Sequence, residues 1–307
     1  MMEIRRNKLI IFTTIVLLLA ILLEANTNTN NDNDNNNFMN SLHSIKDYNL
    51  LEENDLLDII KHKTINIKIG VYNYAAYNTI FGAKHYWILF DPLNNFSISN
   101  NSMLLPFLLS PYNVDKSNFY HCDMPACSSI YKPTGYLSNM TIDEMKIYME
   151  NSCEKIISDG LQIKLWDKVS NVSETIKLGL MPSLACYNKS LYEKPKLLQA
   201  ITLKSVLDWI PSVVNYLDID AQGADLPLLF SITNNLRKIR HIKVECQKQP
   251  LNGYYMYDND VINECNDIIS YLQNNSFILK ELEVNNCGIS EFNAYFSNTN
   301  LIHKINN

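Results

Sequence analysis

In several short stretches of this chain apolar residues either alternate with polar ones or form a continuous run, and both patterns are typical of β-strands. The stretches are 65–71 (I-N-I-K-I-G-V), 85–90 (H-Y-W-I-L-F), 213–219, 241–246, 277–284 and 292–296. Apolar residues at helical spacing predict helices over 44–61, 202–210, 226–236 and 261–274. Strands that alternate with helices predict an α/β fold with a mostly parallel sheet. The last two strands follow each other directly, so we expect one antiparallel C-terminal strand.

The N-terminal residues carry a different pattern. Residues 1–8 hold three basic side chains, 9–25 are apolar almost throughout, and 26–43 are rich in Asn. Basic residues before a short apolar run are typical of a signal peptide or an uncleaved signal anchor. We expect an anchor that makes this a single-pass type II membrane protein, with the remainder of the chain in the ER or Golgi lumen. Cleavage, which would give a secreted protein, is the alternative. The Asn-rich residues are expected to form a disordered stalk.

Composition narrows the class of protein. With 307 residues and 47% apolar content, the chain can bury the core of one domain, placed at residues 44–300. Residues 139–200 interrupt the strand–helix alternation and are interpreted as a strand-rich insertion. The net charge of −6, with no basic stripe beyond residue 8, argues against a nucleic-acid partner. The seven cysteines could pair in an oxidising lumen, and their connectivity stays open.

The segment from Val213 to Asp225 (V-V-N-Y-L-D-I-D-A-Q-G-A-D) is the main candidate for a functional site. Asp218 and Asp220 occupy alternate positions at the end of a strand, so their side chains share one face. A bend at Gly223 then returns Asp225 toward the strand tip. Ligands bind at the carboxyl ends of parallel strands, and grouped carboxylates require a cation, a proton or a polar substrate nearby. The alternative is a set of solvated turn carboxylates.

This segment resembles the signature of the FkbM-type methyltransferase family, which is close to K-I-D-x-E/Q-G-x-E/D. Further resemblance lies in T-L-K-S-V-L-D-W-I (202–210), H-I-K-V-E-C-Q (241–247) and E-F-N-A-Y-F-S-N (291–298), and it covers roughly residues 65–298. The resemblance implies a Rossmann-like sheet, S-adenosylmethionine as cofactor, and methylation of a hydroxyl group. Together with the expected compartment, it implies a small-molecule or glycan hydroxyl as acceptor. It leaves the requirement for a divalent metal open.

The resemblance also implies which residues hold the cofactor. Gly70 and Asn73 match the small-residue turn after the first strand. Asp91, in F-D-P, matches an acid that accepts hydrogen bonds from the ribose hydroxyls. Residues 119–130 resemble the third strand and its loop, which places Asp123 and Ser128 beside the adenine or the substrate. For this last stretch an ordinary polar loop is the alternative.

The turn after the first strand departs from the family pattern. It lacks the leading acid and the second glycine, and the spacing to Asp91 is a few residues short. A catalytically inactive, methyltransferase-like binding module is therefore the second hypothesis.

Three residues are candidates for the chemistry itself: Asp220, Asp225 and His121. An attacking hydroxyl benefits from a general base, and either Asp220 or His121, at a predicted strand tip, could serve.

Two neighbours of these candidates have open roles. Glu245, near the tip of the adjacent strand, could complete a carboxylate cluster or could pair with Lys243 or Arg240 at the surface. His241 begins that strand at the opposite end, so a structural role is expected for it. Gln222 stands where many relatives carry Glu.

Overall fold

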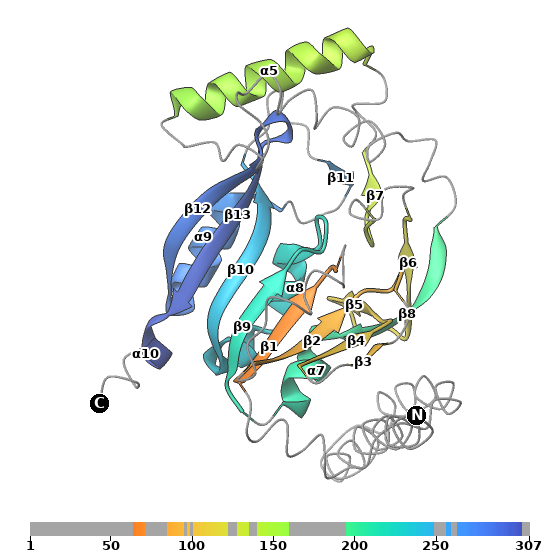
Figure 1. Cartoon of the computed structure of the whole chain (residues 1–307), viewed down its shortest axis with the longest axis vertical. Coiled ribbons are helices and arrows are strands. Elements are labelled where there is room, and N and C mark those ends of the chain that lie inside the picture. The colour runs from red at the N-terminus through yellow and green to blue at the C-terminus, as the bar shows by residue number, and fades with distance from the viewer. Residues whose placement is uncertain are drawn as a thin grey trace.

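The computed structural model (Figure 1) describes residues 64–71, 85–94, 97–98, 101–121, 128–134, 140–159, 195–210, 212–248, 256–258 and 263–302. The predicted helix 44–61, the predicted anchor 9–25 and the predicted stalk 26–43 lie outside these residues. Within the described part of the chain, no helix has the length and apolar character needed to cross a membrane.

Eight strands of the described chain form one sheet, in the order β12-β13-β10-β9-β1-β2-β4-β3. They are β1 (Thr64–Ile69), β2 (His85–Phe90), β3 (Ser97–Ile98), β4 (Ser102–Leu105), β9 (Val214–Ile219), β10 (Ile239–Gln247), β12 (Phe277–Asn286) and β13 (Glu291–Asn298). Strands β10, β9, β1, β2 and β4 are parallel, whereas β13 runs antiparallel to both of its neighbours. The predicted α/β fold, with a mostly parallel sheet and an antiparallel C-terminal strand, is confirmed.

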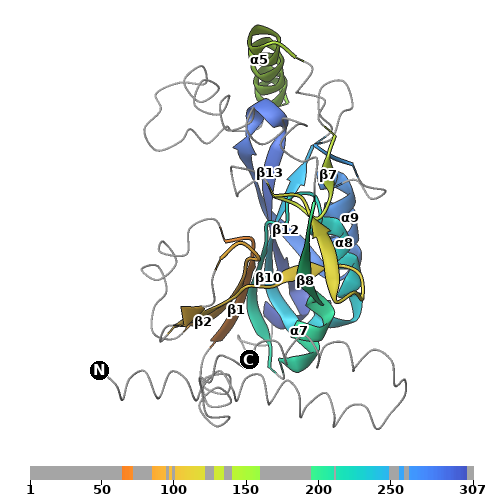
Figure 2. The ribbon, with the colours of Figure 1, turned by 90° about the vertical axis from the view of Figure 1, so that its right-hand side faces the viewer.

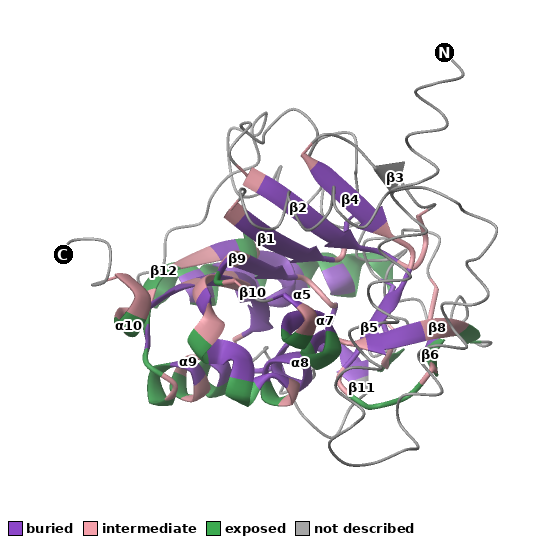
Figure 3. Cartoon of the chain, turned by 90° about the horizontal axis from the view of Figure 1, so that it is seen from below, coloured by how far each residue is buried: buried purple, intermediate pink, exposed green. Residues whose placement is uncertain are grey.

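The central strand β1 is buried on both faces of the sheet. Ile65, Ile67 and Ile69 belong to the main hydrophobic core, on the side where the described helices lie in Figures 2 and 3: α7 (Leu203–Trp209), α8 (Asp225–Ser231) and α9 (Cys265–Asn274). A smaller apolar cluster is formed by Val71, Trp87, Leu89 and Leu104. Side chains of one strand alternate between the faces, so the polar residues of β1, Asn66 and Lys68, share the face opposite the isoleucines.

Most predicted elements of the C-terminal half are confirmed with small shifts. Helix α7 begins where predicted, because the Thr202 side chain accepts a hydrogen bond from the Ser205 backbone N–H. The helix predicted over 226–236 ends earlier. Helix α8 stops at Ser231 and is followed by the 3₁₀ helix η4 (Thr233–Lys238).

The prediction that residues 119–130 supply the third strand of the main sheet is wrong. Strand β4 pairs with β2 in that position. Phe119 instead ends β6 (Lys116–Phe119), which forms a separate three-stranded sheet with β8 (Lys196–Thr202) and β5 (Leu108–Ser110). Strand β4 is only four residues long (S-M-L-L), which is too short for an alternating pattern to stand out in the sequence.

The interpretation of 139–200 as strand-rich is wrong for its first part, because 142–158 form helix α5 (Ile142–Ser158). Its buried side has helical spacing but mixed residue types, and Ile142, Ile147 and Ile157 are exposed elsewhere on the helix, so the apolar pattern is weak; the buried residues are Met145, Tyr148, Met149, Ser152, Cys153 and Ile156. The missed signal is the capping box, in which the side chains of Thr141 and Glu144 bond each other's backbone N–H groups. Helix α5 packs on η6 (Cys287–Ile289), at the hairpin end of β12 and β13 (Figure 1).

All four cysteines in the described part of the chain are paired. Cys153 of α5 bonds Cys287 in η6, and Cys246 of β10 bonds Cys265 at the start of α9. A two-stranded ribbon of β7 (Lys132–Pro133) and β11 (Tyr257–Asp258) lies at the same end of the molecule (Figure 1). Helix α5 and the β7–β11 ribbon therefore lie at the end of the molecule toward which β9 and β10 run (Figure 1).

Candidate active site

A row of charged side chains crosses three neighbouring strands on one face of the sheet. Lys68 of β1, Asp218 of β9 and Lys243 of β10 are paired in register. The Lys68 ammonium lies 3.2 Å from Asp218 Oδ1, and the Lys243 ammonium lies 3.7 Å from the same oxygen. Lys68 is only 3% exposed, and a buried ammonium requires such a partner. Asp218 is thus a partner of lysines on adjacent strands, as expected of a residue facing a neighbouring strand.

Asp220 continues this row beyond the end of β9. Its Oδ2 atom lies 3.6 Å from the Lys68 ammonium, and its Oδ1 atom accepts a hydrogen bond of 2.9 Å from the Gln222 amide. Lys68 therefore contacts both Asp218 and Asp220, which confirms that the two carboxylates share one face. The Asp220 side chain is 37% exposed, against 11% for Asp218, so Asp220 is the carboxylate that a ligand can reach.

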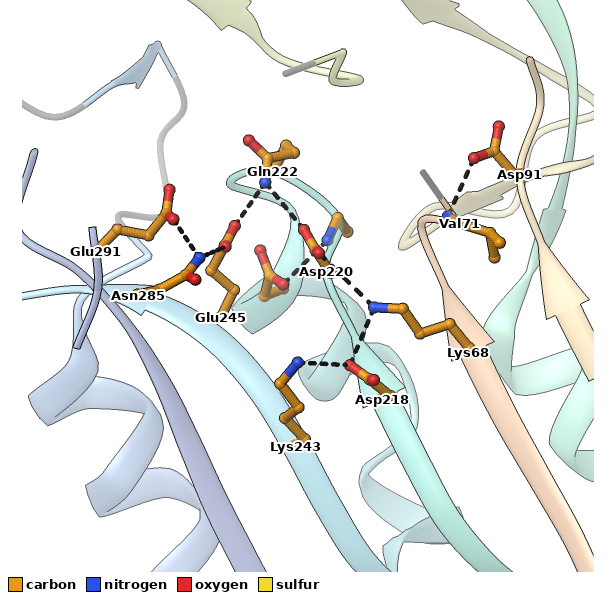
Figure 4. Close-up of polar contacts among 12 residues, drawn as sticks. Lys68, Val71, Asp91, Asp218, Asp220, Gln222, Lys243, Glu245, Asn285 and Glu291 are labelled. Carbon is orange, nitrogen blue, oxygen red and sulfur yellow. Dashed lines mark hydrogen bonds and ion pairs between the residues drawn. The ribbon is translucent and has the colours of Figure 1, made fainter. Parts of the chain in front are cut away.

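Behind Asp220 lies a chain of polar side chains, drawn in Figure 4, in which Gln222, Glu245 and Glu291 are buried and Asn285 is exposed. The Gln222 amide donates to Asp220 and also, at 2.6 Å, to Glu245 Oε2. The Asn285 amide donates to Glu245 Oε1 and to Glu291 Oε1. Burial raises the pKa of Glu245 well above its usual value, and it raises the pKa of Glu291 to about 7. Negative charge on Asp220 acts in the same direction on both groups, so the two glutamates resist full ionisation.

Asp225 stabilises the loop itself. Its Oδ1 atom accepts from the Ala221 backbone N–H and its Oδ2 atom from that of Gly223, each at 3.1 Å, and the Asn263 amide donates to Oδ2. The side chain is fully buried, and burial raises its pKa to about 8 although the backbone hydrogen bonds act against this shift. This position favours a structural role, since contact with a substrate would require these bonds to break.

The turn after β1 packs directly against the acid loop. Gly70 has φ of +76°, and a Cβ atom built there would lie 2.1 Å from the Asp220 carbonyl oxygen. Asp220 N–H in turn donates to the Ile69 carbonyl. Glycine is required at this position both for its backbone conformation and for this close approach. The turns that follow β1 and β9 therefore form one unit.

Asp91 holds the other side of the turn after β1 by hydrogen bonds to the backbone. Its Oδ2 atom accepts from the Val71 backbone N–H at 3.0 Å, and its Oδ1 atom accepts from that of Leu93 at 2.8 Å. Burial raises its pKa, and these hydrogen bonds lower it in part. The side chain and backbone of Asn94 also act on the Asp91 carboxylate as hydrogen-bond donors, so a ligand hydroxyl at Asp91 would share it with these groups or displace one of them.

The turn after β1, Asp91 and the acid loop after β9 border one cavity of about 190 Å³ at the carboxyl edge of the sheet. Its described lining includes Gly70, Asp91, Ser128, Ser129, Asp220 and Gln222. Four of the predicted site residues, Gly70, Asp91, Ser128 and Asp220, thus meet in one place. Asp225 and His121 are not among the described lining residues. The predicted cofactor residues Asn73 and Asp123 lie outside the described part of the chain.

The open roles of two neighbours are now settled. Glu245 completes the carboxylate cluster through Gln222, while Lys243 pairs with Asp218 and Arg240 donates to Asn215. His241 has the expected structural position, with its Nδ1 atom 3.0 Å from Ser297 Oγ and its pKa lowered by burial.

Sequence reasoning missed three members of the network: Lys68, Asn285 and Glu291. Lys68 carried a usable signal, since a lysine in the middle of an apolar strand requires an acidic partner on a neighbouring strand. Asn285 and Glu291 lie on either side of the β12–β13 turn, and nothing local in their sequence indicates a site.

Among the residues that the structure describes, no group of three or more His, Cys, Asp or Glu side chains is arranged to hold a metal ion. Comparison of the chain with models of known protein families and with curated proteins found no match.

Proposed function

We propose that this chain is an S-adenosylmethionine-dependent O-methyltransferase of FkbM type, and that it methylates a hydroxyl group. The observation that carries the proposal is the convergence of Gly70, Asp91 and Asp220 on one cavity. Asp91 follows β2 and Asp220 follows β9, on opposite sides of β1. A cofactor seated across β1 would therefore have its ribose at Asp91 and its reacting end at Asp220.

The strand order supports a cofactor at this place. From β1 the chain passes outward to β2 and β4, and it then returns to the other side of β1 to form β9 and β10. The order reverses between β1 and β9, and ligands of open α/β sheets bind at such a reversal. The reversed strand β13 between β10 and β12 distinguishes this sheet from the order 3-2-1-4-5-6 of dinucleotide-binding folds. It is the ending expected from the family resemblance.

The charge of the cavity favours a cationic ligand over a phosphate-bearing one. Its described lining residues include two carboxylates, Asp91 and Asp220, and no Lys, Arg or His. A dinucleotide diphosphate would meet repulsion there, whereas the sulfonium and ammonium groups of S-adenosylmethionine would be attracted.

The proposed reaction needs one base. The acceptor oxygen attacks the methyl carbon in line, a C–O bond forms, and the C–S bond breaks with its electron pair passing to sulfur. The hydroxyl proton passes to the Asp220 carboxylate, the more exposed carboxylate at the tip of β9. Correct positioning of the two reactants supplies several kcal/mol of the rate enhancement, and the base contributes roughly 10²–10⁴-fold.

Calorimetric titration of the purified full chain with S-adenosylmethionine tests this proposal. Asp91→Asn, which keeps the size of the side chain but removes its charge, should weaken binding about tenfold through the lost ribose contact. The matched control Asp267→Asn changes an exposed residue on α9 and should bind as the unchanged chain does. No heat of binding at millimolar cofactor would reject the proposal.

A catalytically inactive binding module is the second candidate, and the size of the cavity favours it. About 190 Å³ is less than the roughly 300–1,000 Å³ typical of small-molecule sites. Transfer of a labelled methyl group from the cofactor to glycan acceptors separates the two functions. Transfer that is lost in Asp220→Asn would exclude the inactive module.

The paired cysteines support the secretory pathway as the compartment. Disulfides persist in oxidising environments such as the ER lumen, and Cys153–Cys287 and Cys246–Cys265 are both formed. We therefore propose that residues 9–25 anchor the chain and that the described domain is lumenal. Sequencing of the mature N-terminus separates this arrangement from the secreted alternative.

A further inference from the structure

Gln222 is held in an unusual conformation at the centre of the acid loop. Its φ of +49° lies in the left-handed region, which non-glycine residues rarely adopt. The residue is 9% exposed. Its backbone carbonyl accepts a 2.6 Å hydrogen bond from Ser129 Oγ, which comes from the β7 side of the cavity. A strained conformation persists only where the surroundings fix it, and here they do so through both the backbone and the side chain.

Every hydrogen-bonding group of the Gln222 side chain is used. The amide nitrogen donates to Asp220 Oδ1 at 2.9 Å and to Glu245 Oε2 at 2.6 Å. The amide oxygen accepts from the Tyr257 hydroxyl at 2.8 Å. A carboxylate accepts and a phenol donates, so this assignment of amide nitrogen and oxygen satisfies all three partners, and the reverse would place the amide oxygen against the oxygens of both Asp220 and Glu245. The orientation of the amide is therefore determined.

The Gln222 amide also separates two groups of negative charge. On one side lies Asp220, which faces Lys68 and the cavity. On the other side lie the buried Glu245 and Glu291, which share the amide of the exposed Asn285. A neutral donor between them bonds both groups without adding charge, whereas a third carboxylate would increase the repulsion.

We propose that Gln222 is a positioning residue, which fixes the orientation of the Asp220 carboxylate toward the sulfonium end of the cofactor. This inference rests on the proposed function. The ion pair with Lys68 constrains the Asp220 side chain loosely, because the ammonium lies 3.6 Å from its Oδ2 atom. The hydrogen bond from Gln222 to Oδ1 fixes the second oxygen and thereby the plane of the carboxylate.

Two ligands that differ in sulfonium charge test the inference. S-adenosylmethionine carries this charge, and S-adenosylhomocysteine lacks both the charge and the methyl group. In Gln222→Met the side chain keeps its length but loses its donors, so the ratio of the two affinities should shift about tenfold toward S-adenosylhomocysteine. A merely structural role would weaken both ligands equally and leave the ratio unchanged, which would overturn the inference.

Gln247→Met is the matched control. Gln247 is also buried, at the end of β10, and within the described part of the chain its side chain bonds the backbone of Ile289 and Met256. The variant should lower stability while leaving the affinity ratio as it is in the unchanged chain. A shift of the same size in Gln247→Met would contradict a role specific to Gln222.

A second measurement does not depend on any ligand. Nitrogen-15 spectra detect side-chain amide protons, and those of Gln222 are identified by their loss in Gln222→Met. They should exchange with solvent at least tenfold more slowly than the amide protons of the exposed Gln273 on α9. Equal exchange would overturn the inference even if the cofactor binds. If the unchanged chain binds no cofactor, the proposed function fails, and slow exchange would still establish the fixed orientation of the amide.

Discussion

At the scale of single residues, the interior of the sheet depends on balanced charge. Lys68 lies in the central strand, where its neighbours on β1 are buried. Its ammonium contacts Asp218 and Asp220, and Lys243 contributes a second positive charge at Asp218. A buried ion pair adds little net stability, but removal of one partner leaves an uncompensated charge. The row is therefore sensitive to single substitutions.

Lys68→Met should destabilise the protein by about 3–5 kcal/mol, because Asp218 would keep only the longer contact with Lys243. Urea unfolding of the purified variant measures this loss. The matched control Lys204→Met removes an exposed lysine from its ion pair with Asp208 on α7 and should cost no more than about 0.5 kcal/mol. Equal losses of unfolding free energy in the two variants would show that Lys68 is not needed to compensate the buried charge of Asp218.

The buried glutamates predict a dependence of stability on pH. Burial raises the pKa of folded Glu291 from its ordinary 4.5 to about 7. Between these pH values the unfolded chain has released a proton that the folded chain retains. The contribution of Glu291 is therefore complete below about pH 4.5, decreases as pH rises, and is lost above about pH 7. Its size is on the order of 3 kcal/mol.

Glu291→Gln should flatten this dependence, because an amide resembles the protonated acid and can still accept from Asn285. Melting temperatures measured from pH 4.5 to 7 should decrease less steeply in the variant than in the unchanged chain. Glu281→Gln, at an exposed position of β12, should keep the original slope. Parallel curves for all three proteins would contradict the assignment of the proton to the buried pair.

The sequence predicted some residues of the site because their signal is local. Asp218 and Asp220 share a face through strand alternation, and Asp91 follows directly from an apolar strand. Glu291 and Asn285 reach the site only because β13 returns beside β10, and such pairing over a long distance leaves no local pattern.

At the scale of elements, two turns determine the shape of the site. The turn after β1 and the acid loop after β9 contact each other through Gly70 and Asp220. The contact leaves no room for a side chain at Gly70, so the two parallel strands end at a fixed distance. The cavity between Asp91 and Asp220 depends on this distance.

Gly70→Ala should therefore affect both stability and the site. The positive φ costs about 1–2 kcal/mol for a non-glycine residue, and the clash with the Asp220 carbonyl adds to this cost. Urea unfolding should show a loss of at least ~2 kcal/mol. Gly288→Ala is the comparison, since its nearest neighbour is the end of the Met149 side chain, and it should leave cofactor affinity unchanged. An unchanged cofactor affinity in Gly70→Ala would show that the turn does not position the site.

Elements with strong periodicity were predicted well, and short or mixed ones were not. Strands β1 and β9 alternate apolar and polar residues, β2 is a continuous apolar run, and α7 has a clear capping residue. Strand β4 is too short for a pattern, and the buried side of α5 mixes Met, Tyr, Ser and Cys residues. The arrangement of β5, β6 and β8 depends on strands far apart in the chain, so burial by tertiary contacts decides their position.

At the scale of the whole molecule, two disulfides in the described part of the chain connect helices α9 and α5 to the strands and hairpin of the main sheet. Cys246–Cys265 closes a short loop of 19 residues and fixes the start of α9 beside β10. Cys153–Cys287 joins residues 134 apart and attaches α5 to the hairpin of β12 and β13. Helix α5 also contacts this turn through Ser152, whose hydroxyl donates to the Cys287 carbonyl.

The longer loop should contribute more stability, because a cross-link restricts the unfolded chain more when it joins distant residues. Chain entropy gives roughly 5 kcal/mol for a loop of 134 residues and roughly 3 kcal/mol for one of 19. Cys153→Ala/Cys287→Ala should therefore unfold at lower urea than Cys246→Ala/Cys265→Ala. In the first variant, hydrogen exchange should also show α5 losing protection before β9, since α5 keeps only its packing and the Ser152 contacts. A larger loss in the second variant would mean that the bond beside Glu245 stabilises the fold through the carboxylate network and the α9 terminus, rather than through chain entropy.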